Sequence, residues 1–166
     1  MKQVFALLLA VTVLLSLTAC SGQEEPQPQA PSVTTEAPAA PADMSAIYEE
    51  MEKTLPEMIP MDETTMLNFC GISAEDCTQV VAAICADGLI TDEVWLIEAK
   101  DEASLATLKS LAESRLKAKG EESITYSPEQ YAVVQKAQII CDGLYMALIV
   151  SPDVDTLAEI FNGAIG

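Results

Sequence analysis

Five cysteines are the residues of this chain with the greatest capacity for chemistry, and no histidine accompanies them. A thiolate is a nucleophile, a metal ligand and half of a disulfide. The missing histidine removes the usual general base, the Ser-His and Cys-His nucleophile pairs and the commonest zinc ligand. The sequence also contains no Ser-x-x-Lys stretch and no glycine-rich phosphate loop. We therefore expect that the chain is not an enzyme.

Four of the cysteines, Cys70, Cys77, Cys85 and Cys141, fall in the C-terminal three quarters of the chain. Their spacings of 7, 8 and 56 residues match no zinc motif, and no C-x-x-C redox motif occurs, so we expect neither metal nor cofactor. In an exported chain they can form two disulfides, with three connectivities. Cys85 and Cys141 each precede an Asp-Gly pair, which places them where they face each other across paired strands. The alternative is that all four are small buried side chains.

The fifth cysteine, Cys20, closes an N-terminal export signal. Lys2 precedes an almost unbroken apolar run over residues 4–17, which is shorter than the roughly 20 residues of a membrane span. The following Leu17-Thr18-Ala19-Cys20 resembles the lipobox of bacterial lipoproteins. That resemblance implies a diacylglyceryl group on the Cys20 thiol and cleavage between Ala19 and Cys20. Residues 1–19 are thus predicted to be a signal peptide, and the lipid (diacylglycerol, with palmitate-like acyl chains) anchors the chain to a membrane.

The segment after the lipid site is predicted to be a tether. Residues 20–43 contain several prolines and no aromatic residue, which is typical of a disordered spacer. Residues 44–166 then carry 22 acidic and 7 basic groups, a net charge of −15. Such a surface repels nucleic acid and anionic lipid headgroups, so we expect no nucleic-acid partner. The membrane is reached through the lipid alone.

Residues 44–166 are predicted to form a single α+β domain. Apolar residues spaced three and four apart predict helices, and runs rich in β-branched residues predict strands. Ser127, Pro128 and Gln130 match a capping box, in which the Gln130 side chain reaches back to Ser127. A tight turn is predicted at Asp142-Gly143. The predicted helices cover 44–54, 62–69, 101–120, 127–136 and a segment after 153; the predicted strands cover 78–86, 93–100, 137–141 and 144–150.

The chain repeats itself at an offset of 52 residues. Residues 94–114 and 146–166 share six identities, among them Leu96 with Leu148 and Ile97 with Ile149. We interpret the repeat as two similar ββα-like halves. The predicted fold is an antiparallel four-stranded sheet built from these halves, with helices packed on one face and two N-terminal helices in front.

The domain resembles the small bacterial lipoproteins of the domain of unknown function 4358 family, found mostly in Firmicutes and Clostridia. The resemblance rests on Glu93-Val94-Trp95-Leu96-Ile97, on Tyr126-Ser127-Pro128-Glu129-Gln130-Tyr131, and on Gly143 leading through Tyr145 to Ser151-Pro152-Asp153. It implies a signal, a tether and an α+β domain, and it implies no activity. Many hosts of that family are anaerobes, which favours free thiols over disulfides.

These features predict an extracytoplasmic lipoprotein, anchored to the outer face of the bacterial cell membrane, with a non-catalytic binding or interaction domain. The expected partner is an envelope protein or a small ligand. If the sheet has an open face, Trp95 and Tyr145 are the candidate binding surface. Two alternatives remain open: a thiol-based redox protein using Cys85 and Cys141, and a structural component of the envelope.

Overall fold

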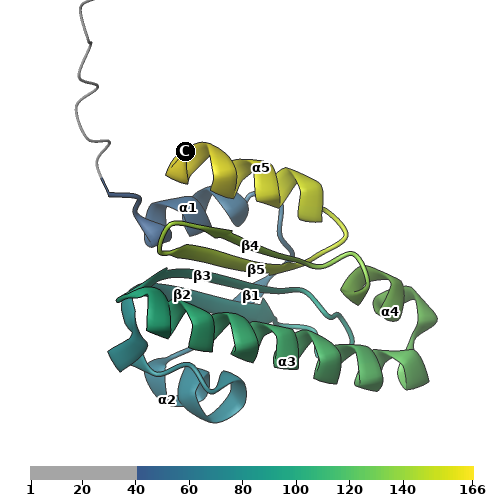
Figure 1. Ribbon diagram of the computed structural model, residues 1–166. Helices are drawn as coiled ribbons and strands as arrows, with labels where there is room; N and C mark the ends of the chain where they lie inside the picture. Colours follow the sequence, from purple (N-terminus) through teal and green to yellow (C-terminus); the bar gives the residue numbers. More distant parts are fainter. Residues whose placement is uncertain (1–40) are drawn as a thin grey trace, which may run out of the picture. The chain divides into compact units, whose positions relative to one another are not determined.

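Two strands at the centre of the fold are apolar along nearly their whole length. β3 (Glu93–Ala99) reads EVWLIEA and β5 (Tyr145–Val150) reads YMALIV. Successive side chains of a strand point to opposite faces, so an uninterrupted apolar run must be covered on both. The computed structural model, which describes residues 41–166, pairs β3 with β5 in the middle of an antiparallel sheet with the order β1-β2-β3-β5-β4 (Figure 1).

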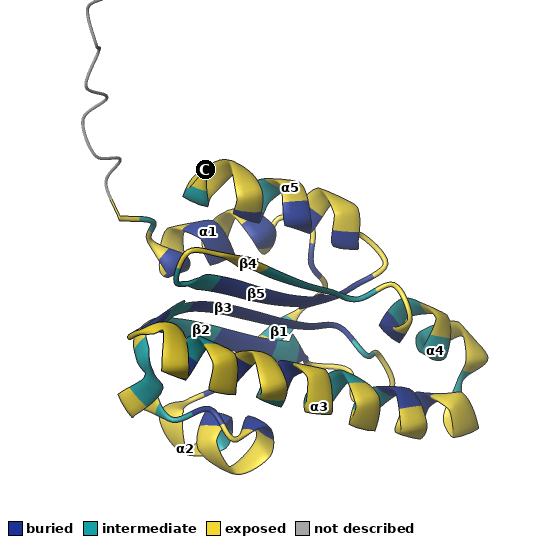
Figure 2. Ribbon diagram, in the orientation of Figure 1, coloured by how far each residue is buried: buried dark blue, intermediate teal, exposed yellow. Residues whose placement is uncertain are grey.

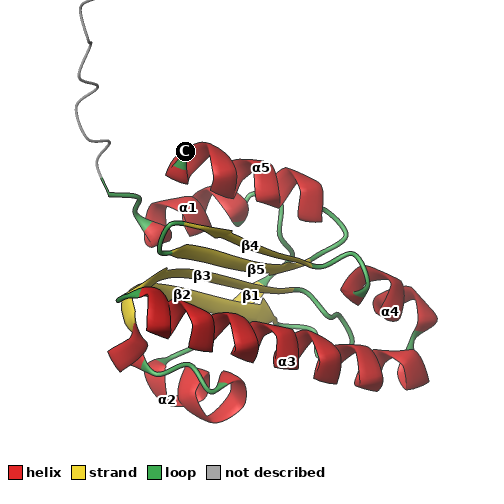
Figure 3. Cartoon of the chain, viewed as in Figure 1, coloured by secondary structure: helices red, strands yellow, loops and turns green. Residues whose placement is uncertain are grey.

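The other elements surround this pair (Figure 3). The predicted signal peptide, Cys20 and the tether up to residue 40 lie outside the described residues. Within the part that the structure describes, no helix is long and apolar enough to cross a membrane.

The remaining strands are β1 (Met58–Pro60), β2 (Cys77–Cys85) and β4 (Gln138–Asp142). The helices are α1 (Met44–Met51), α2 (Glu63–Thr65) with a π-helical continuation over Met66–Cys70, a 3₁₀ turn over Ala74–Asp76, α3 (Glu102–Tyr126), α4 (Pro128–Val134) and α5 (Val154–Ile165).

Helices cover both faces of the sheet, which corrects the prediction that they pack on one face. α1 and α5 lie on one side and α3 and α2 on the other, and the central strands between them are buried (Figure 2). Val94, Leu96 and Ile149 belong to the core shared with α1 and α5. Trp95 and Leu148 belong to the core shared with α3. The α+β class is confirmed, but the sheet is enclosed and has no open face at its centre.

The sheet has five strands where four were predicted. The additional strand, β1, pairs with β2 from Met58 opposite Cys85 to Pro60 opposite Ala83. Three residues ending in proline give no strand pattern in the sequence. Proline lacks an N–H donor and is therefore tolerated at a sheet edge, which is where β1 lies.

α3 continues past Gly120, where the sequence predicted its end, to Tyr126. A Cβ at Gly120 would lie 3.8 Å from Cε2 of Tyr131 on α4, an ordinary contact distance, so the glycine is buried beneath α4. The predicted cap of α4 is confirmed, because Ser127 Oγ accepts from the Gln130 N–H at 3.3 Å and Pro128 follows. The Gln130 side chain does not reach back to Ser127. It bonds to the loop between β2 and β3 instead.

The β4–β5 connection is a tight hairpin, as predicted, although its two loop residues are Gly143 and Leu144 rather than Asp142 and Gly143. Asp142 is paired with Tyr145 at the end of the ladder. Gly143 has a φ of +54°, a left-handed conformation that glycine adopts without steric cost. This is the position at which the hairpin requires glycine.

The two glycines predict opposite effects of the same substitution. Gly120→Ala should raise the free energy of unfolding by about 0.5–1 kcal/mol, because alanine is the better helix former and its methyl group has room. Gly143→Ala should lower it by about 1–2 kcal/mol, because the left-handed conformation then crowds a Cβ. No heavy atom lies within 4 Å of that added Cβ, so backbone strain is the cause. Urea unfolding followed by tryptophan fluorescence measures both; a loss of stability in Gly120→Ala would contradict the ordinary contact distance between α4 and a methyl group at this position.

Candidate functional site

A fully buried carboxylate lies where the sheet meets α3. Glu93 is the first residue of β3 and has no exposed surface. Its Oε1 accepts from Arg115 Nε at 3.0 Å and from Trp95 Nε1 at 2.8 Å. Its Oε2 accepts from Arg115 Nη2 at 2.9 Å and lies 3.0 Å from Lys119 Nζ. A bidentate guanidinium and an ammonium group thus share one carboxylate, which satisfies the charge that burial would otherwise penalise.

Both cations come from α3, one helical turn apart. The side chains of Arg115 and Lys119 are only 19% and 11% exposed. Burial opposes the charged form of Arg115, yet its hydrogen bonds to Glu93 and the opposite charge raise the pKa of the guanidinium above its ordinary value. The guanidinium carbon also lies 5.5 Å from the centre of the Phe69 ring. The Glu93–Arg115–Lys119 cluster therefore locks the rotation of α3 against β3.

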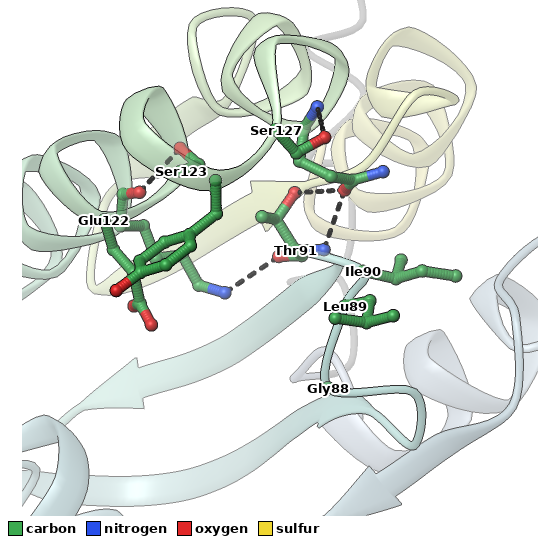
Figure 4. Close-up of a pocket in the computed structure, with 10 residues that line it drawn as sticks. Gly88, Leu89, Ile90, Thr91, Glu122, Ser123 and Ser127 are labelled. Atoms are coloured by element: carbon green, nitrogen blue, oxygen red, sulfur yellow. Dashed lines mark hydrogen bonds between the residues drawn. The ribbon is translucent and has the colours of Figure 1, made fainter.

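The same cluster holds the loop between β2 and β3, residues 86–92. Lys119 Nζ also donates a hydrogen bond to the Thr91 carbonyl at 2.8 Å. The Gln130 side-chain oxygen accepts from both the N–H and the hydroxyl of Thr91, each at 2.9 Å. Figure 4 shows these bonds converging on Thr91 from the helical side. The loop is thus tied to α3 and α4 by side chains far away in sequence.

A cleft of about 560 Å³ lies between this loop and the junction of α3 with α4. Leu89 and Ile90 come from the loop, and Ser123 and Ser127 come from the helical side (Figure 4). Leu89 is 84% exposed and Tyr126 82% exposed, so large apolar surfaces stand in water at its walls. The lining residues are Gly88, Leu89, Ile90, Thr91, Lys119, Glu122, Ser123, Tyr126, Ser127 and Gln130.

The polar groups of the cleft are largely committed to the protein itself. Ser123 donates its hydroxyl hydrogen bond to the Lys119 carbonyl at 2.7 Å. Lys119 is ion-paired with Glu93, and the Gln130 oxygen is occupied by Thr91. What the cleft offers a ligand is apolar area, the amide N–H groups of Gln130 and the exposed carboxylate of Glu122.

A second buried carboxylate lies beside the cluster. Asp92 is 4% exposed, and its Oδ2 finds no hydrogen-bond partner among the described residues. Burial raises the pKa of Asp92, while a hydrogen bond from Ser151 and the charge of Lys119 act in the opposite direction. Asp92 is thus a buried carboxyl group at the end of the 86–92 loop, next to Thr91, and its burial disfavours the charged form.

Trp95 and Tyr145, the predicted binding surface, do not form one. Trp95 is completely buried against the α3 face and donates to Glu93. Tyr145 is half-buried in the core on the other face, where its hydroxyl accepts from the Ala42 N–H at 3.3 Å. The prediction required an open sheet face, and helices cover both faces at this point. Trp95 is instead part of the packing that surrounds the Glu93 carboxylate.

All four cysteines of the described residues are free thiols. Cys85 on β2 and Cys141 on β4 do not face each other, because β3 and β5 lie between those strands. Burial raises the pKa of Cys70 and of Cys77 to about 11. Cys141 is exposed, although partial burial of its sulfur raises its pKa as well. Between residues 41 and 166, no group of cysteine and carboxylate side chains is arranged to hold a metal ion.

Sequence reasoning missed the cluster, yet a signal for it was present. Leu108 and Ala112 are buried positions of α3, and Arg115 and Lys119 continue the same stripe at the next spacings of three and four. Charged residues on the inward stripe of a helix require a buried partner. Glu93, a lone carboxylate at the start of an apolar strand, was the candidate for that partner.

Comparison with protein families places the chain. Residues 49–151 match the family described as a domain of unknown function (DUF4358), and the chain belongs to that family. The match covers well over half of the chain and includes the whole cleft and the Glu93–Arg115–Lys119 cluster. Searches of curated proteins and of solved structures gave no match.

Replacing Glu93 should show how much the pairing with its two cations contributes to the free energy of unfolding. Glu93→Gln keeps the shape of the side chain but leaves Arg115 and Lys119 without their counter-charge, so the free energy of unfolding should fall by about 3 kcal/mol or more. The matched control is Glu50→Gln, which breaks the exposed pair with Lys53 and should cost less than about 1 kcal/mol. Urea unfolding measures both. Similar losses in the two variants would show that the buried cluster contributes little.

Thiol accessibility tests the redox alternative. In a Cys20→Ser background at pH 8, we expect one fast-reacting thiol, Cys141, and three that react only after unfolding, because Cys70 and Cys85 are buried and Cys77 has a raised pKa. A chromogenic disulfide reagent gives the count, and adding Cys141→Ser should remove the fast phase. Two native thiols that react at matched rates, or a Cys85–Cys141 disulfide after mild oxidation, would contradict the structure.

Proposed function

We propose that this member of the DUF4358 family is a lipid-anchored, non-catalytic binding protein of the bacterial cell envelope, and that its domain binds a partner in the cleft beside the 86–92 loop. The sequence supports the anchor through Cys20 in Leu17-Thr18-Ala19-Cys20 and a tether up to residue 43. Two acyl chains on one cysteine hold a protein durably on a membrane. The domain then works outside the cytoplasm, within reach of the tether.

The observation that best supports a binding role is that large apolar side chains are exposed at the cleft while the loop that forms it is held in place by hydrogen bonds. Leu89 and Tyr126 leave more than four fifths of their surface in water, which is unfavourable in an isolated domain. At the same time Lys119 and Gln130 anchor Thr91, so the loop has already lost much of its conformational freedom. A pre-organised site pays less ordering entropy when a ligand arrives. These are the properties of a surface shaped for a partner.

A non-catalytic role is supported by the chemistry of the lining. The sequence has no histidine to serve as a base, and Lys119 is held in an ion pair. The Ser123 hydroxyl donates to a backbone carbonyl of its own helix. No lining residue is therefore paired as nucleophile and base in the way that covalent catalysis requires.

Photocrosslinking in the native envelope tests the proposal. A benzophenone amino acid placed at Leu89 or at Tyr126 should give adducts in the membrane fraction of living cells, because both side chains line the cleft and are exposed. The matched control is the same amino acid at Ile59, which is 51% exposed on the edge strand β1 and lies outside the cleft. It should give no such adduct.

The anchor is tested in the same cells. Cys20→Ala removes the thiol that accepts the lipid, so the protein should leave the membrane fraction and the cleft adducts should weaken. Equal adducts from Leu89 and Ile59, or none from either cleft position, would refute binding in the cleft. Retention of the Cys20→Ala protein in the membrane after removal of residues 1–19 would refute the lipid anchor.

A further inference from the structure

We propose that the occupant of the cleft is a basic segment of a partner protein that inserts apolar side chains between Leu89 and Tyr126. This inference rests on the proposed function, since it assumes that the cleft is the binding site. It adds the chemical class of the partner, which is a cationic, apolar-anchored peptide stretch. The size and lining of the cleft, the charge around it and its place on the domain lead to it.

The cleft has the size and lining for side chains of a peptide. About 560 Å³ accommodates several residues, and the facing walls are Leu89 and Ile90 on one side and Tyr126 on the other. Burying Leu89 alone removes a largely exposed leucine from water, which favours an apolar group between the walls. The N–H groups of Gln130 remain available for a backbone carbonyl because its oxygen is bonded to Thr91.

The charge around the cleft selects a cationic partner. Lys119 is the one cation in the lining, and the Glu93–Arg115–Lys119 cluster to which it belongs carries one net positive charge, which the three carboxylates around the cleft outweigh. Glu122 also lines the cleft, and Asp87 and Glu129 are exposed immediately beside the lining residues Gly88 and Gln130. Residues 44–166 carry a net charge of −15. Lysine or arginine side chains flanking an apolar anchor would meet these carboxylates, which speeds association and penalises acidic competitors.

The same charge argues against the other occupants. A second copy of this domain brings another −15, and the chain's own residues 21–43 contain acidic residues and no lysine or arginine. Both would place negative charge against negative charge. Anionic lipid headgroups are repelled for the same reason.

The cleft also lies at the end of the sheet away from the point where the chain enters the domain. The backbone of Ala42 is hydrogen-bonded to the side chain of Tyr145, the first residue of β5, and to the side chain of Gln79, near the start of β2. The 86–92 loop follows the last residue of β2, so roughly 20–25 Å of that strand separates the two places. Figure 1 shows the start of α1 and the α3–α4 junction at opposite ends of the domain. The chain that leads to the predicted anchor therefore enters the domain away from the cleft and leaves the cleft free for an envelope partner.

Fluorescence anisotropy with defined peptides tests the inference on the full chain carrying Cys20→Ser. The probe is a labelled peptide with a Leu-Trp pair flanked by lysines, and its counterpart has glutamate in place of every lysine. We expect the basic peptide to bind, with an affinity that falls as salt is added, and the acidic peptide not to bind. Leu89→Ser should weaken binding about tenfold and Glu122→Gln about threefold. Ile59→Ser, an exposed apolar residue outside the cleft, should leave it unchanged.

The outcomes separate this inference from the proposed function. Basic-peptide binding that survives Leu89→Ser would be attraction to the acidic surface in general and would overturn the inference. Preference for the acidic peptide would overturn it as well. If the Leu89 crosslinks form in the envelope but the basic peptide does not bind, the inference fails and the binding cleft stands. If neither occurs, both fail. Circular dichroism of each variant confirms that it is folded.

Discussion

The arrangement of this domain depends on how one fully buried carboxylate is neutralised. Glu93 has no exposed surface, and an unpaired charge in that position would cost several kcal/mol. Arg115 and Lys119 reach it together only if α3 lies across the start of β3 in one rotation. Lys119 then also holds the Thr91 carbonyl. The interaction that stabilises the helix against the sheet therefore also sets the position of the loop that forms the cleft.

The central strands show how far sequence patterns lead. The apolar run of β3 was predicted correctly as a strand, but helices were predicted on only one face of the sheet, whereas the structure buries β3 on both faces. The repeat at an offset of 52 residues obscured this. Leu96 and Leu148 align in sequence but face opposite sides of the sheet; Ile97 faces α3, and Ile149 faces α5. In each unit the isoleucine faces the helix that follows its own strand, and the leucine faces the opposite side of the sheet. The two helices nevertheless lie on opposite faces, because sequence similarity within a unit does not determine on which face its helix packs.

The candidate site was less predictable than the fold, for a physical reason. The cations of α3 lie on its inward stripe, so a pattern reading could have found them. The bond from Gln130 to Thr91 spans 39 residues and joins a loop to a helix start. Neither segment has a hydrophobic periodicity from which this contact could be predicted. The N-cap of α4 was predicted correctly at Ser127, but the capping box was not formed, because the Gln130 side chain bonds to Thr91 in place of the expected local bond.

In the proposed function, stability and binding are served by different residues of one small region. The carboxylate of Glu93 is fully paired with Arg115, Lys119 and Trp95, so it stabilises the packing of α3 against the sheet and is not available to a ligand. The exposed walls contribute nothing to the core, because Leu89 and Tyr126 lie largely in water. Loops on a rigid scaffold can change their side chains without disturbing the fold. We therefore expect partner choice to be determined by the 86–92 loop and the α3–α4 junction, and the fold by the sheet and the Glu93–Arg115–Lys119 cluster beneath them.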